Sequence, residues 1–226
     1  MATESTTDQP TSPPLRIGVA LFPGFQALDV FGPLDCLNIL SWTHTNMSMS
    51  ILAATLDPVS TQIPESPHTI GQHVVPTHTF SSPPPLDVLL VPGGLGTRGS
   101  PPELLQVIDF IRTVYPSLKY LITVCTGSGV AARAGVLDGR RATTNKLAWK
   151  EITALGPNVS WVPRARWVVD GNVWTASGVT AGIDATIAWI EEVFGAEMAL
   201  EIANGMEHTR HTDPEVDPFA DLYGLA

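Results

Sequence analysis

Short apolar runs alternate with segments of helical spacing along most of this chain. The predicted strands are 15–22, 47–55, 86–91 and 120–124, and the predicted helices are 29–40, 103–114, 146–155, 180–193 and about 196–206. Asp170-Gly171 predicts the turn of a hairpin over 164–176. Strands that alternate with helices predict an α/β fold, a mostly parallel sheet covered on both faces. In such sheets the active site lies beyond the carboxyl ends of the strands.

The ends of the chain differ in character from its centre. Residues 1–14 are polar and proline-rich, and we expect them to be disordered. Residues 207–226 are acidic and contain proline, which predicts either a tail or a packed-down extension. The whole chain has 226 residues, a length that suits one α/β domain, here predicted over 15–206.

Composition narrows the function classes. The net charge of −10 would repel a phosphate backbone, so we expect no nucleic-acid partner. No apolar run reaches 18 residues, and the first ten residues lack the basic and apolar regions of a secretory signal, so neither a membrane span nor export is expected. The two cysteines form no disulfide framework. These features together favour a cytoplasmic protein.

The segment Tyr120-Leu-Ile-Thr-Val-Cys125-Thr126-Gly-Ser-Gly129 carries the clearest chemical signal. An apolar strand ends at a cysteine, and a helix of small residues follows. A nucleophile on such a strand-to-helix turn is lifted out of the sheet, as in hydrolases with a Gly-x-Ser-x-Gly elbow. The helix N-terminus would favour the reactive thiolate of Cys125. The alternative is an inert cysteine buried at a strand end.

Two further segments should meet Cys125 at the same edge of the sheet. Asp29, flanked by apolar residues, is either a desolvated general acid/base or a helix N-cap. Gly93 and Gly94 follow a predicted strand and either offer backbone N–H groups to a developing charge or form a plain turn. Thr126 is either a second N–H donor with a substrate-facing hydroxyl or an ordinary first-turn residue.

The remaining metal-ligand and thiol residues carry weaker signals. His208 and His211 have i, i+3 spacing but no matching cysteine, so we expect no metal site. Cys36 lies on an apolar helical segment and is interpreted as packing.

Three segments together resemble the ThiJ/PfpI superfamily: Leu86-Asp-Val-Leu-Leu-Val-Pro-Gly-Gly94, Val124-Cys-Thr-Gly-Ser128 and Ser177-Gly-Val-Thr-Ala-Gly-Ile-Asp184. Within it, the chain most resembles the isonitrile (isocyanide) hydratases, and the same unit is similar to the ligand-sensing half of some AraC-type regulators. The resemblance implies a flavodoxin-like sandwich over 15–206, of the class I glutamine amidotransferase-like type, and a homodimer.

The resemblance also implies roles for particular residues. Cys125 would be an elbow nucleophile with a strained backbone, Asp29 its acid/base partner, and Gly94 and Thr126 would hold the substrate. Many relatives carry a histidine about 20 residues after the elbow, where this chain reads Arg141-Ala-Thr-Thr-Asn145-Lys146. A Cys–His pair is therefore absent at that position, which argues against protease-like chemistry.

These observations lead to one leading hypothesis and two alternatives. The first is a cofactor-independent enzyme that hydrates a small-molecule isonitrile to an N-formamide through Cys125 and Asp29. The second is a glyoxalase- or hydratase-type activity on a reactive carbonyl or a specialised metabolite. The third is a non-catalytic ligand or redox sensor, oxidised at Cys125.

Overall fold

The computed structural model describes residues 15–44, 46–63 and 68–225, so the expectation for 1–14 lies outside it. Its centre is a seven-stranded sheet in the order β10-β11-β7-β6-β1-β2-β5. The strands of this sheet are β1 (Leu15–Ala20), β2 (Met47–Ala53), β5 (His78–Thr79), β6 (Val88–Val91), β7 (Tyr120–Val124), β10 (Trp167–Asp170) and β11 (Val173–Ala176). All neighbouring strands are parallel except β10 and β11, which form the expected hairpin. The predicted mostly parallel α/β sheet is therefore confirmed.

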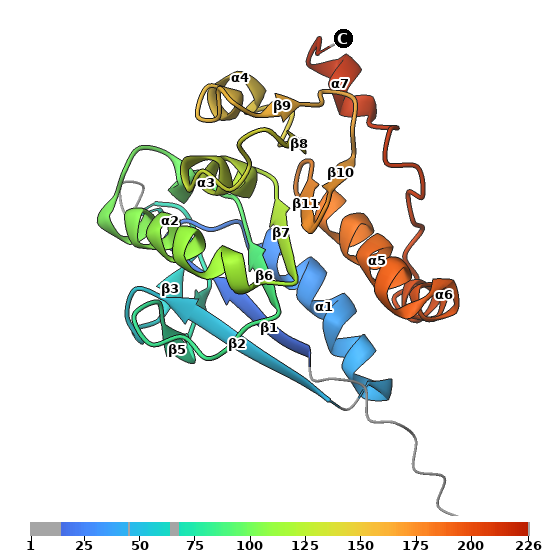
Figure 1. The fold of residues 1–226 in the computed structure, drawn as a ribbon, viewed down its shortest axis with the longest axis horizontal. Coiled ribbons are helices and arrows are strands. Elements are labelled where there is room, and N and C mark those ends of the chain that lie inside the picture. The colour runs from blue at the N-terminus through green and yellow to red at the C-terminus, as the bar shows by residue number, and fades with distance from the viewer. Residues whose placement is uncertain (1–14, 45, 64–67, 226) are drawn as a thin grey trace, which may run out of the picture.

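Helices cover both faces of the sheet, as Figure 1 shows. The longer helices are α1 (Ala27–Thr43), α2 (Pro102–Val114), α3 (Gly127–Arg133), α5 (Ala181–Phe194) and α6 (Ala196–Gly205). Helices α1, α5 and α6 pack on one another on one face, and α2 packs on α3 on the other. The core lies between the layers, where β6 is buried along its whole length.

Several short elements lie between the longer ones. They are β3 (Val59–Ser60) with β4 (His73–Val74), β8 (Arg141–Ala142) with β9 (Ser160–Trp161), the 3-10 helices Leu95–Thr97 and Tyr115–Ser117, and α4 (Trp149–Thr153). Helix α4 is shorter than the predicted 146–155. The reason is local: the Asn145 side chain accepts the N–H of Ala148 at 3.0 Å, so a side-chain turn replaces the expected first helical turn.

The C-terminal segment packs along the domain. Figure 1 shows it running from α6 past α5 and β10 to α7 (Pro218–Leu222). His208 contacts Asp184 at 2.8 Å, and the N–H of Arg166 donates to the carbonyl of Pro214 at 2.7 Å. Asp217 accepts a hydrogen bond from Ser177 at 2.7 Å. The segment is thus attached at its start, middle and end to α5 and to the residues around β10 and β11.

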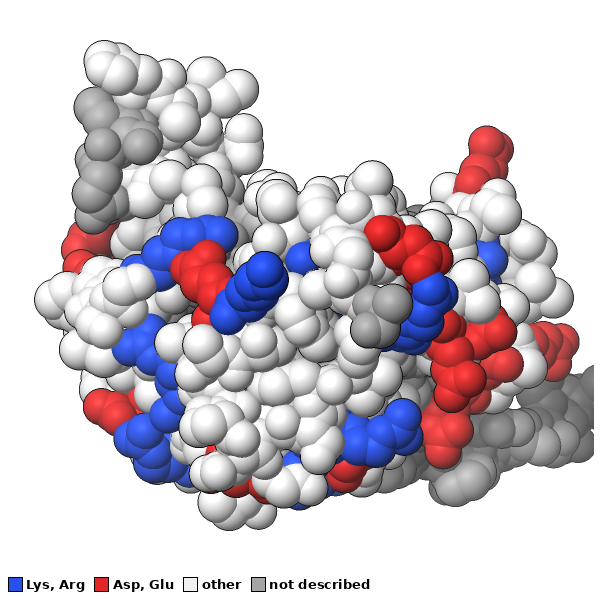
Figure 2. Space-filling model, turned by 90° about the horizontal axis from the view of Figure 1, so that it is seen from above, with Lys and Arg blue, Asp and Glu red and all other residues white. Residues whose placement is uncertain are grey.

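The surface shows no single dominant charge on the face seen in Figure 2. Lys and Arg side chains lie beside Asp and Glu there, and the described residues of that face form no continuous basic area. In the described ranges, no helix combines the length and apolar character needed to span a membrane.

Candidate active site

Cys125 lies at the turn between β7 and α3 with a φ of 58°, the left-handed region that non-glycine residues rarely adopt. Neighbouring groups hold this conformation. The N–H of Cys125 donates to the carbonyl of Ser177 at 2.9 Å, and its own carbonyl accepts from the hydroxyls of Thr144 at 3.0 Å and Ser128 at 3.2 Å. Backbone strain of roughly 1–3 kcal/mol persists only where the surroundings fix it, as they do here.

The sulfur of Cys125 is nearly enclosed, with the residue only 6% exposed. The Asn145 side-chain amide donates to it at 3.2 Å. The backbone amides of Val179 and Thr126 lie near enough to the sulfur to lower the pKa of the thiol. Burial, followed by the charge of Asp29, outweighs these donors and raises the pKa of the thiol to about 12. The expectation that the elbow favours a resting thiolate is therefore wrong, because desolvation outweighs the helix N-terminus.

Asp29 lies in the first turn of α1, after the N-cap residue Gln26, so the N-cap interpretation is wrong. Its Oδ2 accepts the N–H of Gly93 at 2.8 Å. Its buried Oδ1 makes no hydrogen bond, although the Cys125 thiol is near enough to lower the pKa of the carboxyl. Burial dominates and raises the pKa of Asp29 to about 7. The unpartnered oxygen can therefore take up a proton near neutral pH.

Asp29 and Cys125 titrate as a coupled pair. The charge of one disfavours the charge of the other, so the two protons leave in separate steps. Between a pKa of about 7 and one of about 12, the pair holds a single proton. That proton can reside on sulfur or on the carboxyl. A nucleophile and an acid/base are thus available together without a histidine.

Gly93 and Gly94 position the site through contacts within the protein. The N–H of Gly93 is donated to Asp29, and that of Gly94 to the hydroxyl of Thr126 at 3.0 Å. Neither N–H is free to bind a ligand in this structure, in contrast to the expected role. A Cβ at Gly93 would lie 2.5 Å from the Thr126 nitrogen, and one at Gly94 would lie 2.4 Å from the Gly24 carbonyl oxygen. Only glycine permits this close approach.

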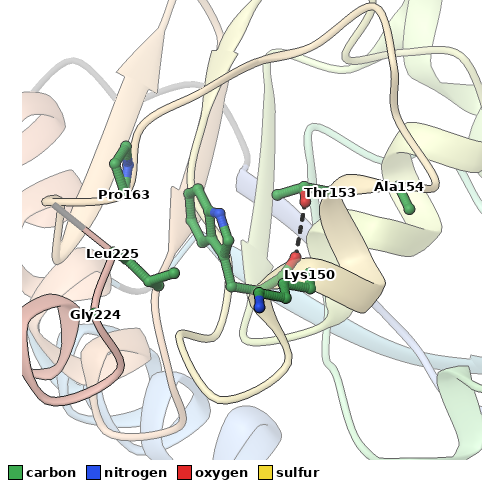
Figure 3. Close-up of a pocket in the computed structure, with 7 residues that line it drawn as sticks. Lys150, Thr153, Ala154, Pro163, Gly224 and Leu225 are labelled. Carbon is green, nitrogen blue, oxygen red and sulfur yellow. Dashed lines mark hydrogen bonds between the residues drawn. The ribbon is translucent and has the colours of Figure 1, made fainter.

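A pocket of about 240 Å³ adjoins the residues that hold the sulfur. Asn145 and Val179 line one part of it, and Phe219 and Tyr223 of the C-terminal segment line another. A second pocket, of about 520 Å³, lies between α4 and the chain end; Figure 3 shows Leu225 and Gly224 on one side and Thr153 on the other. Its lining residues make no hydrogen bond to Cys125. Neither Cys125 nor Asp29 lines the smaller pocket, but its lining residue Asn145 donates to the Cys125 sulfur, so this pocket is the candidate substrate site.

Comparison with known proteins identifies the family of this chain. Residues 15–192 match the DJ-1/PfpI family. The chain belongs to the DJ-1/PfpI family. This confirms the resemblance that the three sequence segments indicated.

Individual relatives of this DJ-1/PfpI chain differ in activity. It is 37% identical to an isonitrile hydratase from Pseudomonas putida over 86% of this chain and 78% of the relative. It is 28% identical to the HTH-type transcriptional regulator CdhR from Pseudomonas aeruginosa over 81% of this chain and 52% of the regulator. The solved structure of a ThiJ/PfpI family protein from Pseudomonas syringae superposes with a TM-score of 0.73 at 27% identity, covering 93% and 83% of the two chains. The relatives of this chain thus include an enzyme and a regulator.

Sequence reasoning missed two residues at the sulfur. Asn145 lies in the segment where many relatives carry a histidine, and sequence patterning assigned it no role. It follows Cys125 by 20 residues, and its side chain contacts the sulfur. Val179 lies inside the Ser177–Asp184 segment, and its φ of 29° turns its amide toward the thiol. A positive φ at a β-branched residue leaves no signal in sequence patterning.

The histidine pair and the second cysteine lie apart from this site. The ring of His208 and the N–H of His211 contact Asp184, which also pairs with Arg166 at 2.7 Å. Over the ranges that the structure describes, no group of three or more His, Cys, Asp or Glu side chains is arranged to hold a metal ion. Cys36 is buried in α1, where its Sγ lies 3.4 Å from a backbone carbonyl.

Proposed function

We propose that this protein hydrates isonitriles to N-formamides, with Cys125 as nucleophile and Asp29 as general acid/base. One observation carries the proposal. A cysteine held at a strained elbow has beside it a buried carboxyl whose Oδ1 is unpartnered and whose pKa is about 7. Efficient general acid/base catalysis needs a pKa near the working pH. The 37% identity to an isonitrile hydratase supports the choice of reaction.

In the first half-reaction, the sulfur attacks the terminal carbon of R–N≡C. The carboxylate of Asp29 accepts the thiol proton as the S–C bond forms, and then delivers it to the same carbon. The product is a thioimidate, R–N=CH–S–Cys125, with no net change in proton count. Proton removal by Asp29 overcomes the high pKa of the buried thiol, because no free thiolate has to form first.

In the second half-reaction, water attacks the thioimidate carbon while Asp29 accepts a proton from it. Asp29 passes this proton to the substrate nitrogen, which gives R–NH–CH(OH)–S–Cys125. The C–S bond then breaks as Asp29 accepts the hydroxyl proton, and R–NH–CHO leaves. The proton on Asp29 returns to the sulfur, which restores the starting pair. The N–H groups of Thr126 and Val179 and the amide of Asn145 stabilise charge on the leaving sulfur. Atoms balance as one isonitrile plus one water.

The test measures product directly. The wild-type protein is incubated with cyclohexyl isocyanide, and N-cyclohexylformamide is followed by NMR. We expect catalytic turnover. A folded protein that forms no formamide would contradict the proposal. A parallel assay of methylglyoxal conversion to lactate tests the carbonyl alternative, and saturable isonitrile binding without conversion would support a ligand sensor instead.

A further inference from the structure

The C-terminal segment contributes side chains to the pocket beside the candidate nucleophile. Phe219 and Tyr223, one turn apart on and after α7, line the pocket together with Asn145 and Val179. Asn145 donates a hydrogen bond to the Cys125 sulfur at 3.2 Å, and the backbone amide of Val179 lies near enough to lower the pKa of the thiol. A substrate that reaches the sulfur through this pocket must therefore pass or contact the two aromatic rings.

The position of α7 is fixed by a buried polar cluster. Asp217 is buried; it accepts the hydroxyl of Ser177 at 2.7 Å and caps α7 by accepting the N–H of Phe219 at 3.1 Å. The Lys146 ammonium lies 3.6 Å from the same carboxylate. Ser177 and Lys146 flank the elbow, since the Ser177 carbonyl accepts the N–H of Cys125 and Lys146 follows Asn145. Helix α7 is thus tied to the residues that position the sulfur.

Both aromatic residues line the pocket and are partly exposed. Phe219 is 46% exposed and Tyr223 is 42% exposed. Contact with an apolar substrate group would remove this area from water and so favour binding. The volume of about 240 Å³ lies below the roughly 300–1,000 Å³ typical of sites for drug-sized ligands. These dimensions suit a substituent of one ring.

We propose that Phe219 and Tyr223 determine substrate specificity, and that they select isonitriles with a single alicyclic or aromatic ring over short alkyl isonitriles. The inference rests on the proposed function. It adds that the C-terminal segment forms the wall against which the substituent R packs, while Cys125 and Asp29 act on the isonitrile carbon at the other end. An isonitrile group has no N–H or O–H to donate, so apolar contacts with R are the part of binding that can distinguish one isonitrile from another.

The experiment compares substrates within each variant. The double variant Phe219→Ala/Tyr223→Ala should lower kcat/KM for cyclohexyl isocyanide by about tenfold, mainly through KM, and change that for ethyl isocyanide less than twofold. Leu222→Ala is the matched control, because Leu222 lies on the same helix, is 68% exposed and does not line the pocket. Leu222→Ala should leave kcat/KM unchanged for both substrates. Equal effects on both substrates, or none, would overturn the inference.

A second variant and a second readout keep the inference separate from protein folding and from the proposed reaction. Phe219→Trp should fill the pocket and lower kcat/KM for the ring substrate more than for the ethyl one. The second readout is the rate of Cys125 alkylation by N-benzyl iodoacetamide divided by the rate with iodoacetamide, measured by peptide mass spectrometry. This ratio measures contact between a ring and the Phe219–Tyr223 side of the pocket without any turnover. The benzyl preference should fall in the double variant. If the benzyl preference falls in the double variant although the wild type hydrates no isonitrile, only the proposed function is contradicted. If the benzyl preference is unchanged, the specificity inference is contradicted.

Discussion

The side-chain amide of Asn145 donates a hydrogen bond to the Cys125 sulfur at 3.2 Å, while its carbonyl oxygen accepts the N–H of Ala148 at 3.0 Å. The second contact fixes the orientation of the first, so the amide always presents a donor to the sulfur. The residue therefore stabilises negative charge on sulfur but cannot act as a base.

Asn145→Ala is predicted to lower kcat/KM for cyclohexyl isocyanide by about 10- to 100-fold, since a hydrogen bond to a charged group contributes roughly 1.5–3 kcal/mol. Asn145→Asp should be more damaging, because it replaces a donor with a second negative charge. Steady-state kinetics check both, with the exposed Asn38→Ala as the control. Unchanged kinetics in Asn145→Asp would show that the contact has no part in the reaction.

The pH dependence of kcat/KM should report the Asp29–Cys125 pair. The active form holds one proton, so the wild-type rate should rise with pH through an apparent pKa near 7 and then stay level to at least pH 9. Asp29→Asn should lower the rate by about 10²–10⁴-fold and remove this acid limb. An acid limb that persists unchanged in Asp29→Asn would assign it to another group.

Asp29 should also lower stability at neutral pH. Its folded pKa of about 7 lies above the unfolded value of about 3.9, so the folded state binds more protons between these values. The folded state is therefore not penalised by Asp29 below pH 4, where the carboxyl is protonated in both states. The free energy of unfolding falls as pH rises through 7, because the buried carboxyl must then ionise. Asp29→Asn is therefore predicted to raise the free energy of unfolding at pH 8 by about 1–3 kcal/mol, and by less at pH 4. Urea unfolding at both pH values measures this; destabilisation at pH 8 would contradict it.

A substitution at Gly93 tests whether the loop after β6 must lie this close to the turn after β7, where Thr126 lies. Gly93→Ala would place a Cβ 2.5 Å from both the nitrogen and the hydroxyl oxygen of Thr126. We predict a loss of roughly 1–3 kcal/mol in stability together with a loss of activity, as overpacking displaces Thr126 or Asp29. Gly205→Ala is the matched control, because no atom lies within 4 Å of its added Cβ. Differential scanning calorimetry should show a lower Tm for Gly93→Ala alone.

Patterning predicted the sheet and its edge because those features depend on local sequence. Buried runs such as β6 and β7 end where Pro92 and Cys125 interrupt them, and parallel strands bring their carboxyl ends together. Asp29, Gly93 and Cys125 could therefore be placed near one another from sequence alone. The thiol pKa could not be predicted, because it depends on how completely the surrounding layers exclude water.

Other features depended on tertiary contacts that leave little local signal. The C-terminal segment could be read as a tail or as a packed extension, and the choice depends on Asp217 meeting Ser177 across 40 residues of sequence. Asn145 ended the predicted helix early because its side chain meets both Ala148 and Cys125. Such partners become visible only once the chain is folded.

Replacing the sulfur tests the central claim most directly. Cys125→Ala and Cys36→Ala make the same substitution at two buried thiols, only one of which faces Asp29. With cyclohexyl isocyanide as substrate, Cys125→Ala should lose at least about 10³-fold in kcat/KM, while Cys36→Ala should stay within about threefold of wild type. Formamide production by folded Cys125→Ala within tenfold of the wild-type rate would contradict the account.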